Sequence, residues 1–334
     1  MASSLSPPMA RALSSGSPPL LRPRRRFFRV SAEIQDSPTP TASVSVANKE
    51  AAEPLVSPPP GFKPPEPKPF TVGQGQTLDV ITASLALPLR LGTGTFVQGY
   101  SSSVVSPDEI GPDEYALNVQ GRKIKETCKL GPRPEKPIEI YEFESCPFCR
   151  KVREIVSVLD LDVLFYPCPR NGPNFRPKVL QMGGKQQFPY MVDPNTGVAM
   201  YESDSIIKYL ADKYGDGTVP LMLSLGFLTT LTAGLAMVAR MGRGSSYLPS
   251  KMPPLPLVFW GYEGSPFCRL VREVLVELEL PHLLRSVARG SPKRQELYKQ
   301  ASHFQAPYLE DPNTGIKMFE SAAIIDYLKA TYSQ

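Results

Sequence analysis

The chain has 334 residues, 41% of them hydrophobic and only 9% aromatic, which is enough apolar material for two small domains. The chain has 37 basic and 32 acidic residues, which gives a formal charge of +5, and six of the basic residues lie in residues 1–32. Without residues 1–32 the formal charge is about −1, so the charge gives no support to a nucleic-acid-binding surface. The five cysteines are odd in number and irregularly spaced, which argues against a disulfide scaffold. With only two histidines, a structural zinc site is not expected, and we expect no metal.

Residues 1–32 have the composition of an organellar transit peptide. They contain six arginines, many serines, no acidic residue and no long apolar core. We expect cleavage near residue 32 and a location in the chloroplast, in the stroma or at a membrane, in preference to the mitochondrion.

The next segment, 33–136, is rich in proline in its first half, as in Pro58-Pro59-Pro60. Such a composition cannot hold a helix or a core, so we expect a disordered or polyproline linker. Within this region, residues 78–100 are apolar but are interrupted by three glycines, and they predict only a short helix that packs elsewhere.

Residues 137–215 form the first of two repeats and predict strand, helix, strand, helix, hairpin and helix. The first strand, 138–143, leads into Cys146-Pro147-Phe148-Cys149, which opens an amphipathic helix. Apolar residues recur on one face of that helix, and we expect its arginines and glutamate to face outward.

Residues 255–334 repeat this pattern 118 to 119 residues later. The turn Asp193 to Gly197 recurs as Asp311 to Gly315, which again signals a hairpin. The first cysteine is replaced, because the second repeat reads Ser265-Pro266-Phe267-Cys268. Only the first repeat therefore keeps a dithiol.

Between the repeats, residues 216–254 predict an apolar helical linker. Residues 219–239 run 21 positions without a charge, which is long enough to cross a bilayer. Proline, glycine and threonine dilute this stretch, so a helix buried between the two repeats is the alternative. Membrane association through 219–239 stays open.

The repeats resemble the thioredoxin-like fold, specifically the amino-terminal domain of glutathione transferases and the glutaredoxins. The resemblance rests on the Cys-Pro-Phe-Cys turn, on Phe188-Pro189 with Ala306-Pro307, and on Glu202-Ser203 with Glu320-Ser321. As a whole, the chain resembles plant plastid proteins with two tandem domains of this type. The expected fold is α/β, with two tandem thioredoxin-like domains that have central mixed four-stranded sheets and are joined by the apolar helical linker.

The two cysteines of the first repeat predict thiol chemistry. A cysteine at a helix amino terminus is acidified by the unpaired N–H groups and the helix dipole, so Cys146 is the candidate nucleophile and Cys149 the resolving thiol. The resemblance implies glutathione as co-substrate. It also implies that Pro189 is cis and faces Cys146, that the Phe188 backbone pairs with glutathione, and that Glu202 and Ser203 hold the γ-glutamyl end.

The second repeat carries the matching residues Pro307, Glu320 and Ser321, and the resemblance to serine-type transferases implies that Ser265 stabilises a glutathione thiolate. The alternative is a non-catalytic copy that only supports the first. Cys268 is expected to be a buried small hydrophobic residue, Cys168 to be packed, and Cys128 to lie exposed in a basic turn-rich segment.

We therefore expect a glutathione-dependent thiol-disulfide oxidoreductase or transferase-like protein that acts on disulfides or glutathionylated proteins. The alternatives are a non-catalytic tandem adaptor at a plastid membrane, a membrane-associated isomerase like the prostaglandin synthases, and an iron–sulfur cluster held between two glutathione-loaded molecules.

Overall fold

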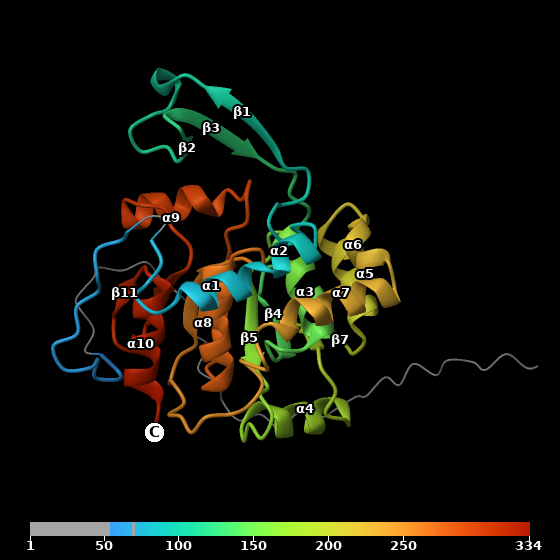
Figure 1. Cartoon of the computed structure of the whole chain (residues 1–334). Helices are drawn as coiled ribbons and strands as arrows, with labels where there is room; N and C mark the ends of the chain where they lie inside the picture. Colours follow the sequence, from blue (N-terminus) through green and yellow to red (C-terminus); the bar gives the residue numbers. More distant parts are fainter. Residues whose placement is uncertain (1–53, 69–70) are drawn as a thin grey trace, which may run out of the picture. The chain divides into compact units, whose positions relative to one another are not determined.

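The computed structural model describes residues 54–68 and 71–334 (Figure 1). The predicted transit peptide, 1–32, and the first part of the predicted linker, 33–53, lie outside the described residues.

The first repeat has the predicted order of elements. They are β4 (Ile138–Glu142), α3 (Pro147–Val158), β5 (Val163–Pro167), α4 (Phe175–Gly183), β6 (Tyr190–Asp193), β7 (Val198–Met200) and α5 (Ser203–Tyr214). Proline at the first helical position and the Cys146 side chain at the cap fix the start of α3. The apolar stripe of α3 is buried against the sheet, with Val152 and Ile155 fully enclosed.

The second repeat has the same order. Its elements are β8 (Leu257–Gly261), α8 (Pro266–Glu277), β9 (His282–Ser286), α9 (Lys293–Ala301), β10 (Tyr308–Glu310), β11 (Lys317–Met318) and α10 (Ser321–Tyr332). The hairpin turns also match, because Asp193 accepts a hydrogen bond from the Tyr214 hydroxyl and Asp311 accepts one from the Tyr332 hydroxyl, each at 2.6 Å.

The strands of both repeats form one sheet, which corrects the expectation of separate four-stranded sheets. The strand order is β11-β10-β8-β9-β5-β4-β6-β7, with β5 and β9 paired antiparallel at the centre (Figure 1). An edge strand leaves one row of N–H and C=O groups unpaired, and here the edge of each repeat satisfies the edge of the other. The described residues, 54–68 and 71–334, accordingly belong to one compact unit.

A buried layer of charges lies where α3 and α8 meet, which corrects the prediction that their polar faces point to solvent. Arg153 contacts Glu263 at 3.0 Å, and Arg272 contacts Glu144 at 3.0 Å, so the arginine of each repeat pairs with the glutamate of the other. All four side chains are buried. A buried ion is stable only when it is paired, so this layer fixes how the repeats fit together.

Two segments outside the predicted repeats also match each other, 150 residues apart. The first contains α1 (Thr77–Ser84) and α2 (Ala86–Leu89), and the second contains α6 (Leu221–Ser224) and α7 (Phe227–Val238). Arg90 donates to Thr232 at 2.5 Å, and Arg240 donates to Thr82 at 2.6 Å. Each arginine also pairs with a buried glutamate, Glu154 of α3 or Glu273 of α8.

These helices expose a large apolar surface, which we name the outward face. It comprises the exposed side chains of Leu78, Ile81, Leu85, Leu89, Leu91, Leu221, Leu225, Phe227, Leu228, Leu231, Leu235, Val238 and Met241. The prediction of a helix buried between the repeats is therefore wrong for this side of α7, although its other side packs against α3 and α2. In the described part of the chain, no helix has the length and apolar character that a bilayer crossing needs.

Part of the predicted linker is folded. Strands β1 (Ser101–Val105), β2 (Leu117–Val119) and β3 (Arg122–Thr127) form a separate three-stranded sheet, and we call residues 101–127 with their connecting loops the arm. Residues 54–68 have no helix or strand, as predicted, but they dock on the second repeat. Phe62 packs against Tyr327 with tilted rings whose centroids lie 5.0 Å apart, and the Lys68 N–H donates to Glu320 at 2.6 Å.

Candidate functional site

In each repeat, the residue directly before Pro-Phe-Cys caps the amino terminus of a helix. In the first repeat, the Cys146 Sγ accepts a hydrogen bond from the Cys149 N–H at 3.3 Å. In the second repeat, the Ser265 Oγ accepts the equivalent bond from the Cys268 N–H at 3.2 Å. The two sites therefore present a sulfur and a hydroxyl in the same local geometry.

The electrostatics of the first site favour a thiolate at Cys146. Hydrogen bonding from Cys149 lowers the pKa of Cys146, against burial and the charge of Glu142, which raise it. Burial raises the pKa of Cys149 well above its usual value, because the charged form loses its solvation. Of the two thiols, Cys146 thus has the lowered pKa and Cys149 the raised one, which is the order that a nucleophile and a resolving thiol need.

Aromatic and cationic side chains crowd the mouth of the first site. Phe188 meets Phe143 edge to face at 6.0 Å between ring centroids, and the Arg176 guanidinium lies 4.8 Å from the Phe188 ring. Only 5% of Cys146 is exposed. A disulfide substrate can reach the sulfur only after the side chains around it move, and Ser265 of the second repeat is buried to the same degree, with 4% exposed.

The predicted glutathione contacts of the first repeat lie near one another. The Phe188-Pro189 peptide bond is cis. Gln187 donates to Glu202 at 2.7 Å, and Ser203 is buried as the first residue of α5.

The second repeat has a cavity beside Ser265. A cavity of about 460 Å³ is lined by Ser265, by Gln305 to Pro307, and by Glu320 and Ser321. Ala306 stands at the position that Phe188 has in the first repeat, so this part of the cavity wall carries a methyl group in place of an aromatic ring. All four residues predicted for the second repeat, Ser265, Pro307, Glu320 and Ser321, therefore line one cavity of a size that suits a small-molecule ligand.

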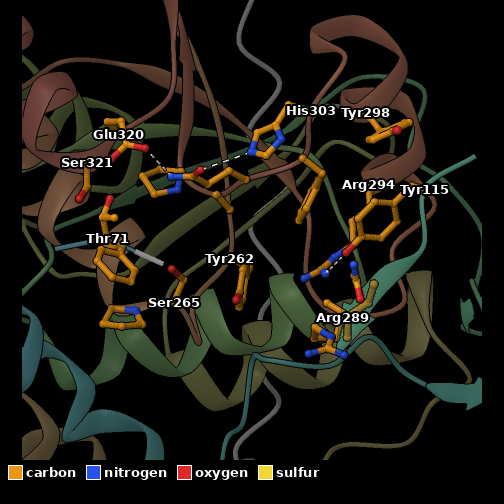
Figure 2. Close-up of a pocket in the computed structure, with 18 of the residues that line it drawn as sticks. Thr71, Tyr115, Tyr262, Ser265, Arg289, Arg294, Tyr298, His303, Glu320 and Ser321 are labelled. Carbon is orange, nitrogen blue, oxygen red and sulfur yellow. Dashed lines mark hydrogen bonds between the residues drawn. The ribbon is translucent and has the colours of Figure 1, made fainter. Parts of the chain in front are cut away.

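One end of the cavity is formed by the start of α10 (Figure 2). The Glu320 Oε1 accepts hydrogen bonds from the Gln305 side chain at 2.9 Å and from the Lys68 N–H. Glu320 has a φ of 71°, and Glu202 of the first repeat has a φ of 69°. A positive φ is costly for glutamate, and it holds the carboxylate beside the free N–H groups that begin the helix.

The other end of the cavity is formed by α9 and the arm. Figure 2 shows Arg289, Arg294 and Tyr115 on the side of Ser265 that is opposite Glu320 and Ser321. The Arg294 Nη1 donates to the Tyr115 hydroxyl at 2.9 Å, and the Arg289 Nε contacts Glu126 at 2.5 Å. Burial raises the pKa of Tyr115, so the Tyr115 hydroxyl stays neutral near pH 7.

Of the remaining cysteines, Cys268 contributes its backbone N–H to Ser265. Cys168 and Cys268 are fully buried, as expected, and burial raises the pKa of both thiols. Cys128 is only partly exposed, and burial raises its pKa as well.

Sequence reasoning missed the roles of Ala306, Tyr115 and Glu126 in forming the cavity. The exchange of Phe188 for Ala306 was visible beside the two prolines, and it is the signal that distinguishes the repeats. Tyr115 and Glu126 carried no comparable signal, because nothing in the pattern of the arm connects it with the second repeat.

Comparison with known proteins matches both repeats to the same domain family. A family model described as "Glutathione S-transferase, N-terminal domain" matches residues 140–218 and 259–334. Among curated proteins, the chain is 33% identical over 82 residues to the glutathione S-transferase-like protein tpcF of Aspergillus fumigatus and 33% identical over 78 residues to gedE of Aspergillus terreus, which has the same description.

These matches are partial. They cover 24% and 23% of this chain and 36% and 34% of the relatives, so the chain spans about a third of their length. Among solved structures, the glutathione transferase BmGSTD1 of Bombyx mori is 33% identical over 25% of this chain and 38% of that one, with a TM-score of 0.23. The protein thus has a mixed α/β fold and two segments similar to the amino-terminal domain of glutathione transferases.

Proposed function

We propose that the protein binds glutathione in the cavity of the second repeat and stabilises its thiolate with Ser265. The observation that carries the proposal is a single cavity lined by Ser265, Pro307, Glu320 and Ser321. The similarity of residues 259–334 to the glutathione S-transferase amino-terminal domain supports it.

The chemistry of the cavity suits a γ-glutamyl thiol. The Glu320 carboxylate provides an acceptor for the ammonium group, since only its Oε1 has hydrogen-bond partners among the described residues. The N–H groups that begin α10 provide donors for the adjacent carboxylate. The Ser265 Oγ already accepts from the Cys268 N–H, so its own O–H proton is free to donate to a sulfur anion.

The test is isothermal titration of the full chain with glutathione, using matched variants of the two repeats. Glu320→Gln should weaken binding at least tenfold, whereas Glu202→Gln in the first repeat should leave this binding event unchanged. Loss of affinity in Glu202→Gln alone contradicts the assignment to the second repeat. Absence of any binding leaves the non-catalytic adaptor as the better hypothesis.

A second function, thiol-disulfide exchange at Cys146, is favoured by the lowered pKa of that thiol. The Cys146 thiolate attacks the sulfur of glutathione in a glutathionylated protein, and the protein thiolate leaves. A second glutathione thiolate then attacks the mixed disulfide, which yields oxidised glutathione and restores the Cys146 thiolate. Reduction of a glutathionylated peptide should stop in Cys146→Ser and continue in Cys149→Ser; unchanged turnover in Cys146→Ser refutes this function.

We also propose a plastid location, on the composition of residues 1–32. A fusion of these residues to a fluorescent protein should enter plastids in leaf cells. A cytosolic or mitochondrial signal contradicts the proposal.

A further inference from the structure

The arm is an insertion that only the first repeat carries. Arg90 and Arg240 are 150 residues apart, whereas Cys146 and Ser265 are 119 apart, so the first repeat has 31 residues that the second lacks. The segment 101–127, which contains strands β1 to β3, accounts for most of them. The cavity of the second repeat is therefore completed by a segment that has no counterpart in the other half.

Hydrogen bonds hold the arm against α9. The Tyr115 N–H donates to Gln295 at 2.6 Å, and the Gln295 side chain donates back to the Asp113 carbonyl at 2.6 Å. The Glu126 side chain, of which only 4% is exposed, contacts both Arg289 and Arg294. The arm thus forms a fixed wall of the cavity.

The charges at this end do not balance. Arg289 and Arg294 share the single carboxylate of Glu126, which leaves about one positive charge beside the cavity. The Arg294 Nε is occupied by the carbonyls of Val287 and Ala288, each at 3.1 Å. Within the described chain, the two Nη atoms of Arg289 have no hydrogen-bond acceptor, and they are free for an anion.

Aromatic rings surround these cations. The Tyr115 ring lies 4.8 Å from the Phe304 ring and 6.2 Å from the Tyr298 ring, centroid to centroid. The Arg294 guanidinium lies 4.6 Å from the Phe304 ring. Walls of this kind favour a flat aromatic ligand, because stacked and edge-on ring contacts add to the burial of apolar surface.

We infer that the arm gives the cavity a second subsite, which takes an aromatic carboxylate. This inference rests on the proposed function, since it places the aromatic ligand beside glutathione. Arg289 binds the carboxylate, and Tyr115, Tyr298 and Phe304 contact the ring.

The test titrates the full chain with 2-naphthoate and with its neutral isostere 2-naphthamide, in the presence and absence of glutathione. Naphthoate should bind at least tenfold more tightly than the amide. Arg289→Gln should remove this preference, and the matched variant Arg170→Gln of the first repeat should keep it. Equal affinities for the two probes in the wild-type chain overturn the inference.

Glutathione is titrated separately into the same variants. Naphthoate binding without any glutathione binding supports the subsite and refutes the proposed function. A tenfold loss of glutathione affinity in Arg289→Gln, with the naphthoate preference intact, overturns the inference, because Arg289 then holds the glycine carboxylate of the tripeptide.

The outward face carries an independent inference. It includes 13 of the 25 large apolar side chains that are exposed in the described chain, although it occupies only residues 77–91 and 221–241. More than a third of each residue is accessible, which makes the surface on the order of 1,000 Å², well above the few hundred Å² of a typical monomer patch. A standard protein interface buries roughly 800 Å² on each partner.

The composition of this face favours a second copy of the chain over a lipid surface. The two segments contain three charged residues, Asp79, Arg90 and Arg240, and Asp79 pairs with Arg240 and with Arg243, which lies just beyond the second segment. Arg90 and Arg240 are buried. No free cation of these segments is left for anionic headgroups, whereas apolar surfaces depleted in charge are typical of homodimer interfaces.

We propose that two copies associate through the outward face. Sedimentation velocity of the full chain should give a dimer, and Ile81→Glu combined with Leu231→Glu should give a monomer with an unchanged far-ultraviolet circular dichroism spectrum. The control Leu180→Glu, on α4 outside this face, should remain a dimer. A wild-type monomer, or a monomer that co-sediments with phosphatidylcholine vesicles through this face, overturns the proposal.

Discussion

Exchanging one side chain between the repeats tests whether Ala306 keeps the cavity of the second repeat open. Ala306→Phe adds a phenyl group with a volume on the order of 100 Å³ to a cavity of about 460 Å³. The ring enters beside Pro307, where we expect the backbone of the tripeptide to lie. Glutathione affinity should therefore fall at least tenfold, which corresponds to about 1.4 kcal/mol or more.

Isothermal titration measures the loss, and thermal unfolding monitors the fold. The first repeat already accommodates Phe188 at the matching position, with Phe143 and Arg176 around it, so the fold should survive. The converse variant, Phe188→Ala, should speed carboxymethylation of Cys146. Undiminished glutathione affinity in Ala306→Phe refutes the placement of the ligand.

Three further predictions concern the cysteines and one buried histidine. Ser265→Cys gives the open cavity a dithiol with Cys268, and it should raise reduction of a glutathionylated peptide several-fold; activity at the wild-type level argues against access through this cavity. Carboxymethylation of native Cys146 followed against pH should give an apparent pKa below the roughly 8.5 of a free cysteine, with Cys149 unreactive; a midpoint above that value contradicts the hydrogen-bonded thiolate. Burial lowers the pKa of His282 to about 4, so as the pH falls the unfolded chain binds a proton at His282 before the folded chain does. The free energy of unfolding should therefore fall by about 3 kcal/mol between pH 6.5 and 4, relative to His282→Gln. Urea unfolding at each pH measures this change. Equal pH profiles for wild type and His282→Gln exclude this effect.

The elements of each repeat were predictable because their signals are local. The Pro-Phe-Cys turn with a capping side chain begins a helix, and the Asp193 and Asp311 turns begin hairpins, wherever the repeat sits in the molecule. The predicted residues of the second repeat also meet in one cavity, since the fold brings the ends of β8 and β10 to the start of α10.

The relation between the repeats was not predictable, because it depends on long-range pairing. A strand pattern such as that of β5 or β9 reads alike whether its edge faces water or another strand. The charges of α3 likewise read as a solvated face, although Arg153 finds Glu263 110 residues away. The arm was missed for the same reason, since its short strands show no sign of the cavity that Tyr115 covers.

The most direct test of the central claim is the ionisation of bound glutathione. Ultraviolet difference spectra across a pH series report the thiolate of glutathione on the full chain. The pKa of the bound thiol should lie at least one unit below that of free glutathione in the wild type and should return toward the free value in Ser265→Ala. Equal thiol pKa values in wild type and Ser265→Ala would contradict the role of Ser265.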